Sequence, residues 1–139
     1  MRQKITVAYC IWIAIIGASA ATAQDASMGE RIYMERCAVC HGETGSGDGI
    51  VGELFAQKPS DLKLLSKNNG GTFPFLETYR AIDGRADIPA HGRSEMPVWG
   101  TYFMQEAIDN PAINEKNARY ITEGRILSLV FYLQTIQVD

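Results

Sequence analysis

Residues 37–49 read Cys-Ala-Val-Cys-His-Gly-Glu-Thr-Gly-Ser-Gly-Asp-Gly, and they decide how the rest of the chain is interpreted. Two residues separate Cys37 from Cys40, and His41 follows at once. The next segment, 42–49, holds four glycines in eight residues, which excludes a regular helix or strand. The residues before the first cysteine have the apolar spacing of a helix. We therefore expect a helix to deliver two thiols and an imidazole to the start of a loop.

The spacing C-x-x-C-H is the signature of covalent haem attachment. The two thiols add across the two vinyl groups of haem, and two intervening residues let both sulfurs reach one edge of the macrocycle. The adjacent histidine then lies beneath the iron and binds it through an imidazole nitrogen. The sequence predicts one haem c per chain, attached by thioethers to Cys37 and Cys40, with His41 as an iron ligand.

The rest of the sequence disfavours three other uses of this motif. A thioredoxin-type redox pair needs a preceding strand, whereas the preceding segment has helical spacing. A zinc site needs two further Cys or His ligands, and only His91 is left in the mature chain. A disulfide between Cys37 and Cys40 would close too small a loop to stabilise the fold much.

The amino terminus has the layout of a secretory signal peptide. The first residues are basic, an uncharged apolar run begins at Ile5, and an A-x-A cleavage site ends at Ala23. An uncleaved membrane anchor is the alternative, because residues 5–24 make up about the 20 residues that cross a bilayer. We expect residues 1–23 to be removed. A single domain over 24–139, without a membrane span, then remains in a bacterial periplasm.

The composition is that of an ordinary folded domain. Of the 139 residues, 46% are hydrophobic and 21% are charged, which excludes a disordered chain and a polytopic membrane protein. Loss of Arg2 and Lys4 with the signal segment leaves 11 basic and 16 acidic residues, a formal charge of −5. This balance excludes nucleic acid as a partner. It favours a redox protein with a basic docking face.

The remaining sequence predicts helices joined by long loops, because no segment alternates with period two. The expected helices, with their caps, are 25–36 (Asp25 or Ser27), 50–56, 72–82 (Thr72, with Gly84 as the stop), 101–109 and 123–137 (Thr122). The expected fold class is therefore all-α.

A second axial ligand to the iron has to come from elsewhere in the chain. The candidates are His91, Met28, Met34, Met96 and Met104. Met28 and Met34 lie on the helix that leads into the motif, where reach to the opposite haem face is poor, and Met104 lies in an expected helix. Met96 lies in an irregular loop directly before a proline, which holds a thioether in place with little loss of entropy. We predict His41 and Met96 as the iron ligands, with His91 as the alternative.

Taken together, these segments resemble a class I c-type cytochrome of the bacterial, monohaem, soluble periplasmic kind. The matching segments, in family order, are 37–42, 45–49, 59–62, 71–85, 91–100 and Tyr132-Leu133. The resemblance implies a class I cytochrome c fold in which helices and long loops enclose the haem and the amino- and carboxy-terminal helices cross. It places Gly29 and Tyr33 against Leu129 and Tyr132 at that crossing.

Further residues around the haem are candidates for supporting roles. The backbone carbonyl of Pro59 could orient His41, and the candidates to face the haem propionates are Arg85, Arg93, Tyr79 and Trp99. Residues 102–120 are longer than a short cytochrome requires and form either a partner-binding elaboration or a plain loop.

Iron with both axial positions filled has no open site for a substrate or peroxide, so we expect an electron carrier rather than an enzyme. The expected function is one-electron shuttling between periplasmic or membrane-bound redox partners, by a monomer or a transient complex. Two alternatives stay open. One is a haem subunit of a dehydrogenase or oxidase complex. The other is a gas- or peroxide-binding haem protein, if Met96 is not a ligand.

Overall fold

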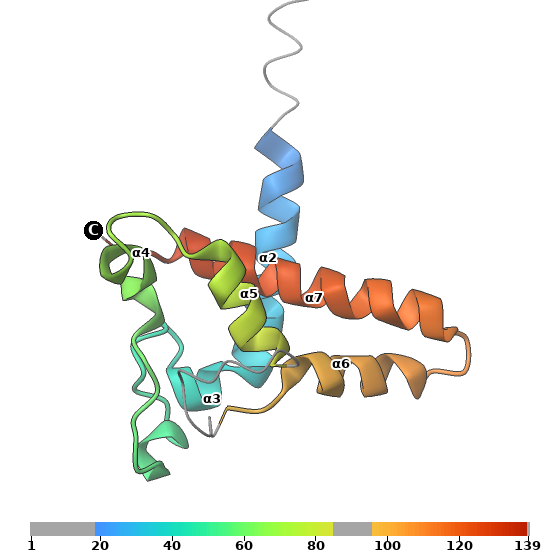
Figure 1. The fold of residues 1–139 in the computed structure, drawn as a ribbon, viewed down its shortest axis with the longest axis horizontal. Helices are drawn as coiled ribbons and strands as arrows, with labels where there is room; N and C mark the ends of the chain where they lie inside the picture. Colours follow the sequence, from blue (N-terminus) through green and yellow to red (C-terminus); the bar gives the residue numbers. More distant parts are fainter. Residues whose placement is uncertain (1–18, 85–95, 139) are drawn as a thin grey trace, which may run out of the picture.

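The computed structural model describes residues 19–84 and 96–138, with side chains described from residue 26 onward. In chain order the elements are α2 (Ser19–Arg36), α3 (Ala38–His41), η1 (Gly52–Leu54), η2 (Leu62–Leu64), α4 (Leu65–Asn68), α5 (Phe75–Asp83), α6 (Trp99–Ile108) and α7 (Glu115–Thr135). Every regular element in this part of the chain is helical, which confirms the all-α prediction (Figure 1). None of these helices is both long and apolar enough to cross a bilayer.

The first and last helices of the described residues, α2 and α7, cross as the resemblance implied, and they form the centre of the fold (Figure 1). Gly29 on α2 faces the backbone of Ser128 on α7 so closely that a Cβ would collide with the Ser128 carbonyl oxygen. Beside this contact the rings of Tyr33 and Tyr132 lie 5.2 Å apart, and Leu129 is fully buried. The glycine therefore lets two helices approach at backbone distance, and the aromatic pair fills the space next to it.

Helix α7 begins two turns earlier than the sequence predicted. Its N-cap is Asn114, whose side chain accepts a hydrogen bond of 2.9 Å from the backbone N–H of Asn117. Thr122, the expected cap, is buried inside the helix and donates its hydroxyl to the carbonyl of Ala118. The prediction was wrong because both residues have good capping side chains, and only packing against α6 shows that Ala118 belongs inside the helix.

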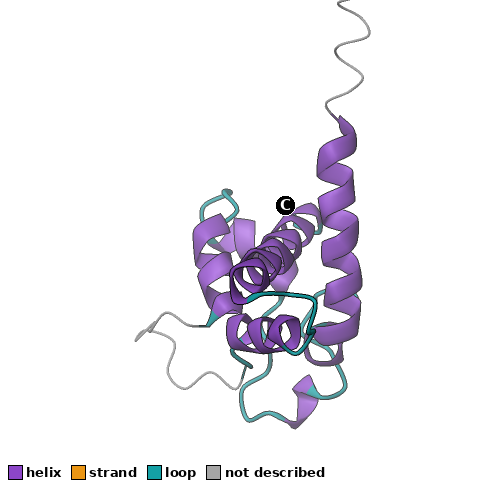
Figure 2. Ribbon diagram, turned by 90° about the vertical axis from the view of Figure 1, so that its right-hand side faces the viewer, coloured by secondary structure: helices purple, strands orange, loops and turns teal. Residues whose placement is uncertain are grey.

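Residues 102–120 are not a plain loop; they form the part of a helical hairpin that includes its turn. Helix α6 continues to Ile108, a short turn follows, and α7 returns along it, as Figure 2 shows in a view along both helices. Phe103 and Ala107 on α6 are buried, as is Ala118 on α7. Asn110 organises the turn, since its side chain accepts a hydrogen bond from the N–H of Ala112. The extra length therefore adds core to the domain.

Three other helix boundaries also differ from the predicted ones. Helix α5 begins after Pro74 instead of at Thr72, and it ends at Gly84, whose φ of 65° fits the expected stop. The predicted 50–56 helix is only the single 3₁₀ turn of η1. Helix α2 begins at Ser19, so the caps expected at Asp25 and Ser27 lie within it.

Candidate functional site

The motif Cys37–His41 lies where α2 gives way to the short helix α3. The N–H of Cys37 still donates to the carbonyl of Tyr33, and the N–H of His41 donates to the carbonyl of Cys37. Both thiols are half-buried, and neither is in a disulfide. Burial raises the pKa of the Cys37 thiol to about 12, and the neighbouring Cys40 adds to the shift. A short helical segment therefore carries the two free thiols of Cys37 and Cys40 and the imidazole of His41.

His41 is half-buried, so water reaches its ring poorly. Its Nδ1 atom is buried and has no hydrogen-bond partner. Burial lowers the pKa of His41, and an interaction with the backbone of Ser60 opposes the shift without forming an aligned bond to Nδ1. The suggested hydrogen bond from the Nδ1 atom of His41 to the Pro59 carbonyl is not formed in this structure, where that carbonyl oxygen lies against Gly47. A buried, neutral imidazole is the form that binds a metal ion.

Backbone carbonyls at the start of the loop after His41 accept hydrogen bonds that attach the loop to the core. The hydroxyl of the buried Tyr33 donates to the carbonyl of Gly42 at 2.6 Å, next to the histidine. The N–H of Gly47 donates to the carbonyl of His41 at 2.8 Å, and the N–H of Leu62 donates to the carbonyl of Gly45. These bonds fix the backbone that follows His41.

The predicted distal ligand lies against the same core as the motif. Met96 is half-buried and packs on the hydrophobic cluster around Tyr33, which Cys37 also contacts. Tyr79 and Trp99, two of the propionate candidates, pack on it as well. The alternative distal ligand His91 and the other two propionate candidates, Arg85 and Arg93, lie outside the described residues.

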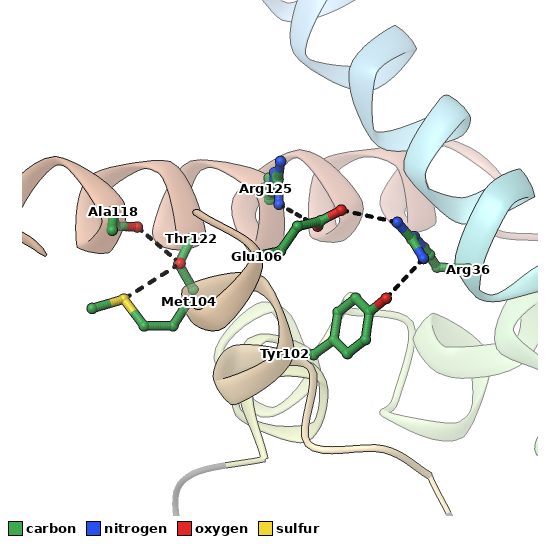
Figure 3. Close-up of polar contacts among 7 residues, drawn as sticks. All are labelled: Arg36, Tyr102, Met104, Glu106, Ala118, Thr122 and Arg125. Atoms are coloured by element: carbon green, nitrogen blue, oxygen red, sulfur yellow. Dashed lines mark hydrogen bonds and ion pairs between the residues drawn. The ribbon is translucent and has the colours of Figure 1, made fainter. Parts of the chain in front are cut away.

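Two of the competing methionine sulfurs contact hydroxyl groups on α7. The sulfur of Met104 lies 3.8 Å from the hydroxyl oxygen of Thr122 (Figure 3), and that of Met28 lies 3.5 Å from the hydroxyl oxygen of Ser128. Met34 is 45% exposed on the surface of α2. All three residues therefore lie on the α2, α6 and α7 scaffold, whereas Met96 lies outside a helix.

Sequence reasoning missed an ion-pair network that joins the motif to α6 and α7. Arg36, the residue before the first cysteine, donates to the Tyr102 hydroxyl and to Glu106, both at 3.0 Å (Figure 3). Arg125 on α7 donates to the other oxygen of Glu106 at 2.7 Å. The guanidinium of Arg36 also lies 5.3 Å from the Tyr102 ring centre. Arg36 and Glu106 are 70 positions apart, so no local pattern could have shown the pair.

The residues present fit a covalently bound haem. Two thiols at the required spacing are half-buried, and the following imidazole has a buried nitrogen that lacks a partner. A thioether from a separate segment packs on the same core. A soft sulfur and an imidazole are the donors that haem iron takes in electron-transfer proteins.

Comparisons with known proteins agree with this site. The family model described as Cytochrome c matches residues 26–137, which is most of the chain and includes the motif. No curated protein and no solved structure matches the chain significantly. With the all-helical fold, this match shows that the chain belongs to the cytochrome c family, whose members carry covalently attached haem c and serve in electron transfer.

Proposed function

We propose that this protein is a one-electron carrier whose haem c is attached through Cys37 and Cys40 and whose iron is bound by His41 and Met96. The bound haem supplies a one-electron couple. Within the polypeptide, α3 presents the imidazole, and the hydrogen bonds at Gly42 and Gly47 hold the backbone that carries it. Little rearrangement then accompanies a change in the oxidation state.

The observation that carries this proposal is the placement of the four described methionines. Two have their sulfur against a hydroxyl on α7 and a third lies on the surface of α2, whereas Met96 lies outside a helix and packs on the same core that Cys37 contacts. A thioether ligand favours the ferrous state and raises the reduction potential. With His41 on one side and Met96 on the other, no position is left for a substrate, which favours electron transfer over ligand binding.

The cellular setting follows from the amino terminus. We place the mature protein, residues 24–139, in a bacterial periplasm after cleavage behind Ala23. Its donor and acceptor are periplasmic or membrane-bound redox proteins. The formal charge of −5 in the mature chain favours partners with a basic docking face.

Replacement of the distal ligand tests the proposal directly. The oxidised holoprotein should show the weak near-infrared band of sulfur-to-iron charge transfer, and Met96→Ala should abolish it, lower the reduction potential and speed cyanide binding. His91→Ala and Met104→Ala, as matched controls, should leave the band in place. Absence of the band from the oxidised wild type, or its retention in Met96→Ala, would contradict the proposed ligand set.

A further inference from the structure

The two most exposed large apolar side chains among the described residues lie in one short loop next to the haem-attachment motif. Ile50 is 78% exposed and Leu54 is 82% exposed. Ile50 lies just before η1 and Leu54 is its last residue, and η1 projects from the body of the molecule at its lower end in Figures 1 and 2. Val39, between the two cysteines, is exposed as well. We refer to Val39, Ile50 and Leu54 as the apolar knob.

The backbone of this loop is clamped onto the motif. The N–H of Val51 donates to the carbonyl of Val39 at 3.0 Å. A Cβ on Gly49 would lie 2.5 Å from the carbonyl carbon of Cys40, and one on Gly52 would collide with its carbonyl oxygen. Only glycine fits at such close approach. The exposed side chains are therefore held at a fixed place beside Cys40 by an ordered backbone.

Three acidic side chains lie close in sequence to the knob, and the next basic residue after them is the exposed Lys58. Glu43, Asp48 and Glu53 are exposed, and no Lys or Arg occurs from residue 37 to residue 57. Arg36, at the near end of this stretch, is paired with Glu106 on α6. An apolar centre within an acidic rim is complementary to an apolar patch within a ring of lysine and arginine side chains.

We infer that the apolar knob and its acidic rim form the docking surface for a redox protein whose own contact face is apolar and ringed by basic residues. The inference rests on the proposed function. It places the partner on the side of the haem-attachment motif that carries the apolar knob. The apolar side chains exclude water in the contact and the acids steer the approach. With haem bound, one electron would pass across this contact between the haem and the partner's redox centre, so that one is oxidised as the other is reduced.

Stopped-flow oxidation of the reduced holoprotein by a strongly basic cytochrome c, used as the model partner, tests the inference. At low salt, Leu54→Ser should slow the reaction about tenfold, because an apolar side chain of this size contributes on the order of 1.5 kcal/mol when buried. Glu53→Gln should slow it about threefold and flatten its dependence on salt. The matched controls on α5 are Leu76→Ser, at a side chain 51% exposed, and Glu77→Gln. Both should leave the rate unchanged.

Ferricyanide, a small anionic oxidant that needs no protein docking, separates the two possible failures. If the wild type does not transfer an electron to ferricyanide, the carrier function fails and the docking inference falls with it. If ferricyanide reacts but the knob variants match their α5 controls, the docking inference alone is wrong. Binding of the wild type to phosphatidylcholine vesicles that is lost in Leu54→Ser would assign the knob to a membrane surface and also overturn the inference.

Discussion

Replacement of Gly29 by alanine sets two effects of opposite sign against each other. In an exposed helix interior, alanine is about 1 kcal/mol more favourable than glycine. At Gly29, however, the added Cβ would collide with the carbonyl oxygen of Ser128 and lie 2.8 Å from the Cβ of Tyr132. Neither neighbour is the end of a flexible side chain, so α2 and α7 have to separate by about 1.5 Å to restore ordinary contact distances.

This separation loosens the most extensive helix contact of the fold. Overpacking of a well-packed site costs about 1–3 kcal/mol, and a collision with the backbone belongs at the upper end of that range. After subtraction of the gain in helix propensity, we expect Gly29→Ala to lower the free energy of unfolding by about 2 kcal/mol. For a domain of this size the midpoint of thermal unfolding should fall by roughly 8 °C.

Gly124 on α7 provides a matched control, because it also lies within a helix and a Cβ there would meet nothing within 4 Å. Gly124→Ala should raise the free energy of unfolding by about 0.5–1 kcal/mol. Urea unfolding of the oxidised holoprotein, followed by far-ultraviolet circular dichroism, measures both variants against the wild type. If Gly29→Ala is as stable as the wild type, the close approach of α2 and α7 is not required for the fold.

Two further predictions concern the attachment of haem and the ion-pair network. Haem should remain with the polypeptide after acid–acetone extraction, whereas Cys37→Ser or Cys40→Ser should leave at most one thioether and shift the pyridine haemochrome band to longer wavelength; extractable haem in the wild type would refute covalent attachment. In a double-mutant cycle of Arg36→Gln and Glu106→Gln, we expect a coupling of about 0.5 kcal/mol in the free energy of unfolding, since both side chains are about one-third exposed. Additive effects would show that the pair contributes no net stability.

Features that depend on neighbouring residues could be predicted from the sequence. Cys37, Cys40 and His41 lie within one five-residue motif, so their spacing alone indicates covalent haem attachment. The family match confirms haem c as the cofactor. The stop of α5 at Gly84 could be predicted for the same reason, since a left-handed residue ends a helix locally. The assignment of Met96 to the iron combines a local setting with tertiary packing, and it stays a prediction.

Other features depend on residues that the chain brings together from a distance. Thr122 and Asn114 both have capping side chains, and Ala118 and Thr122 are buried in the structure, which places both inside the helix and leaves Asn114 as the cap. The pairing of Arg36 with Glu106 joins positions 70 residues apart, and an ion pair of this kind leaves no periodic signal.

The acidic residues of 37–57 could likewise be identified in the sequence, but the exposure of Ile50 and Leu54 within the same stretch could not. Apolar side chains in a chain of this composition are expected to be buried, and nothing local indicates which of them stay exposed. Here the contact of Gly49 and Gly52 with the backbone of Cys40 uses the inner side of the loop, so the flanking side chains project outward. Capping and motif spacing are short-range properties of the chain, whereas burial depends on which distant segments occupy the same space.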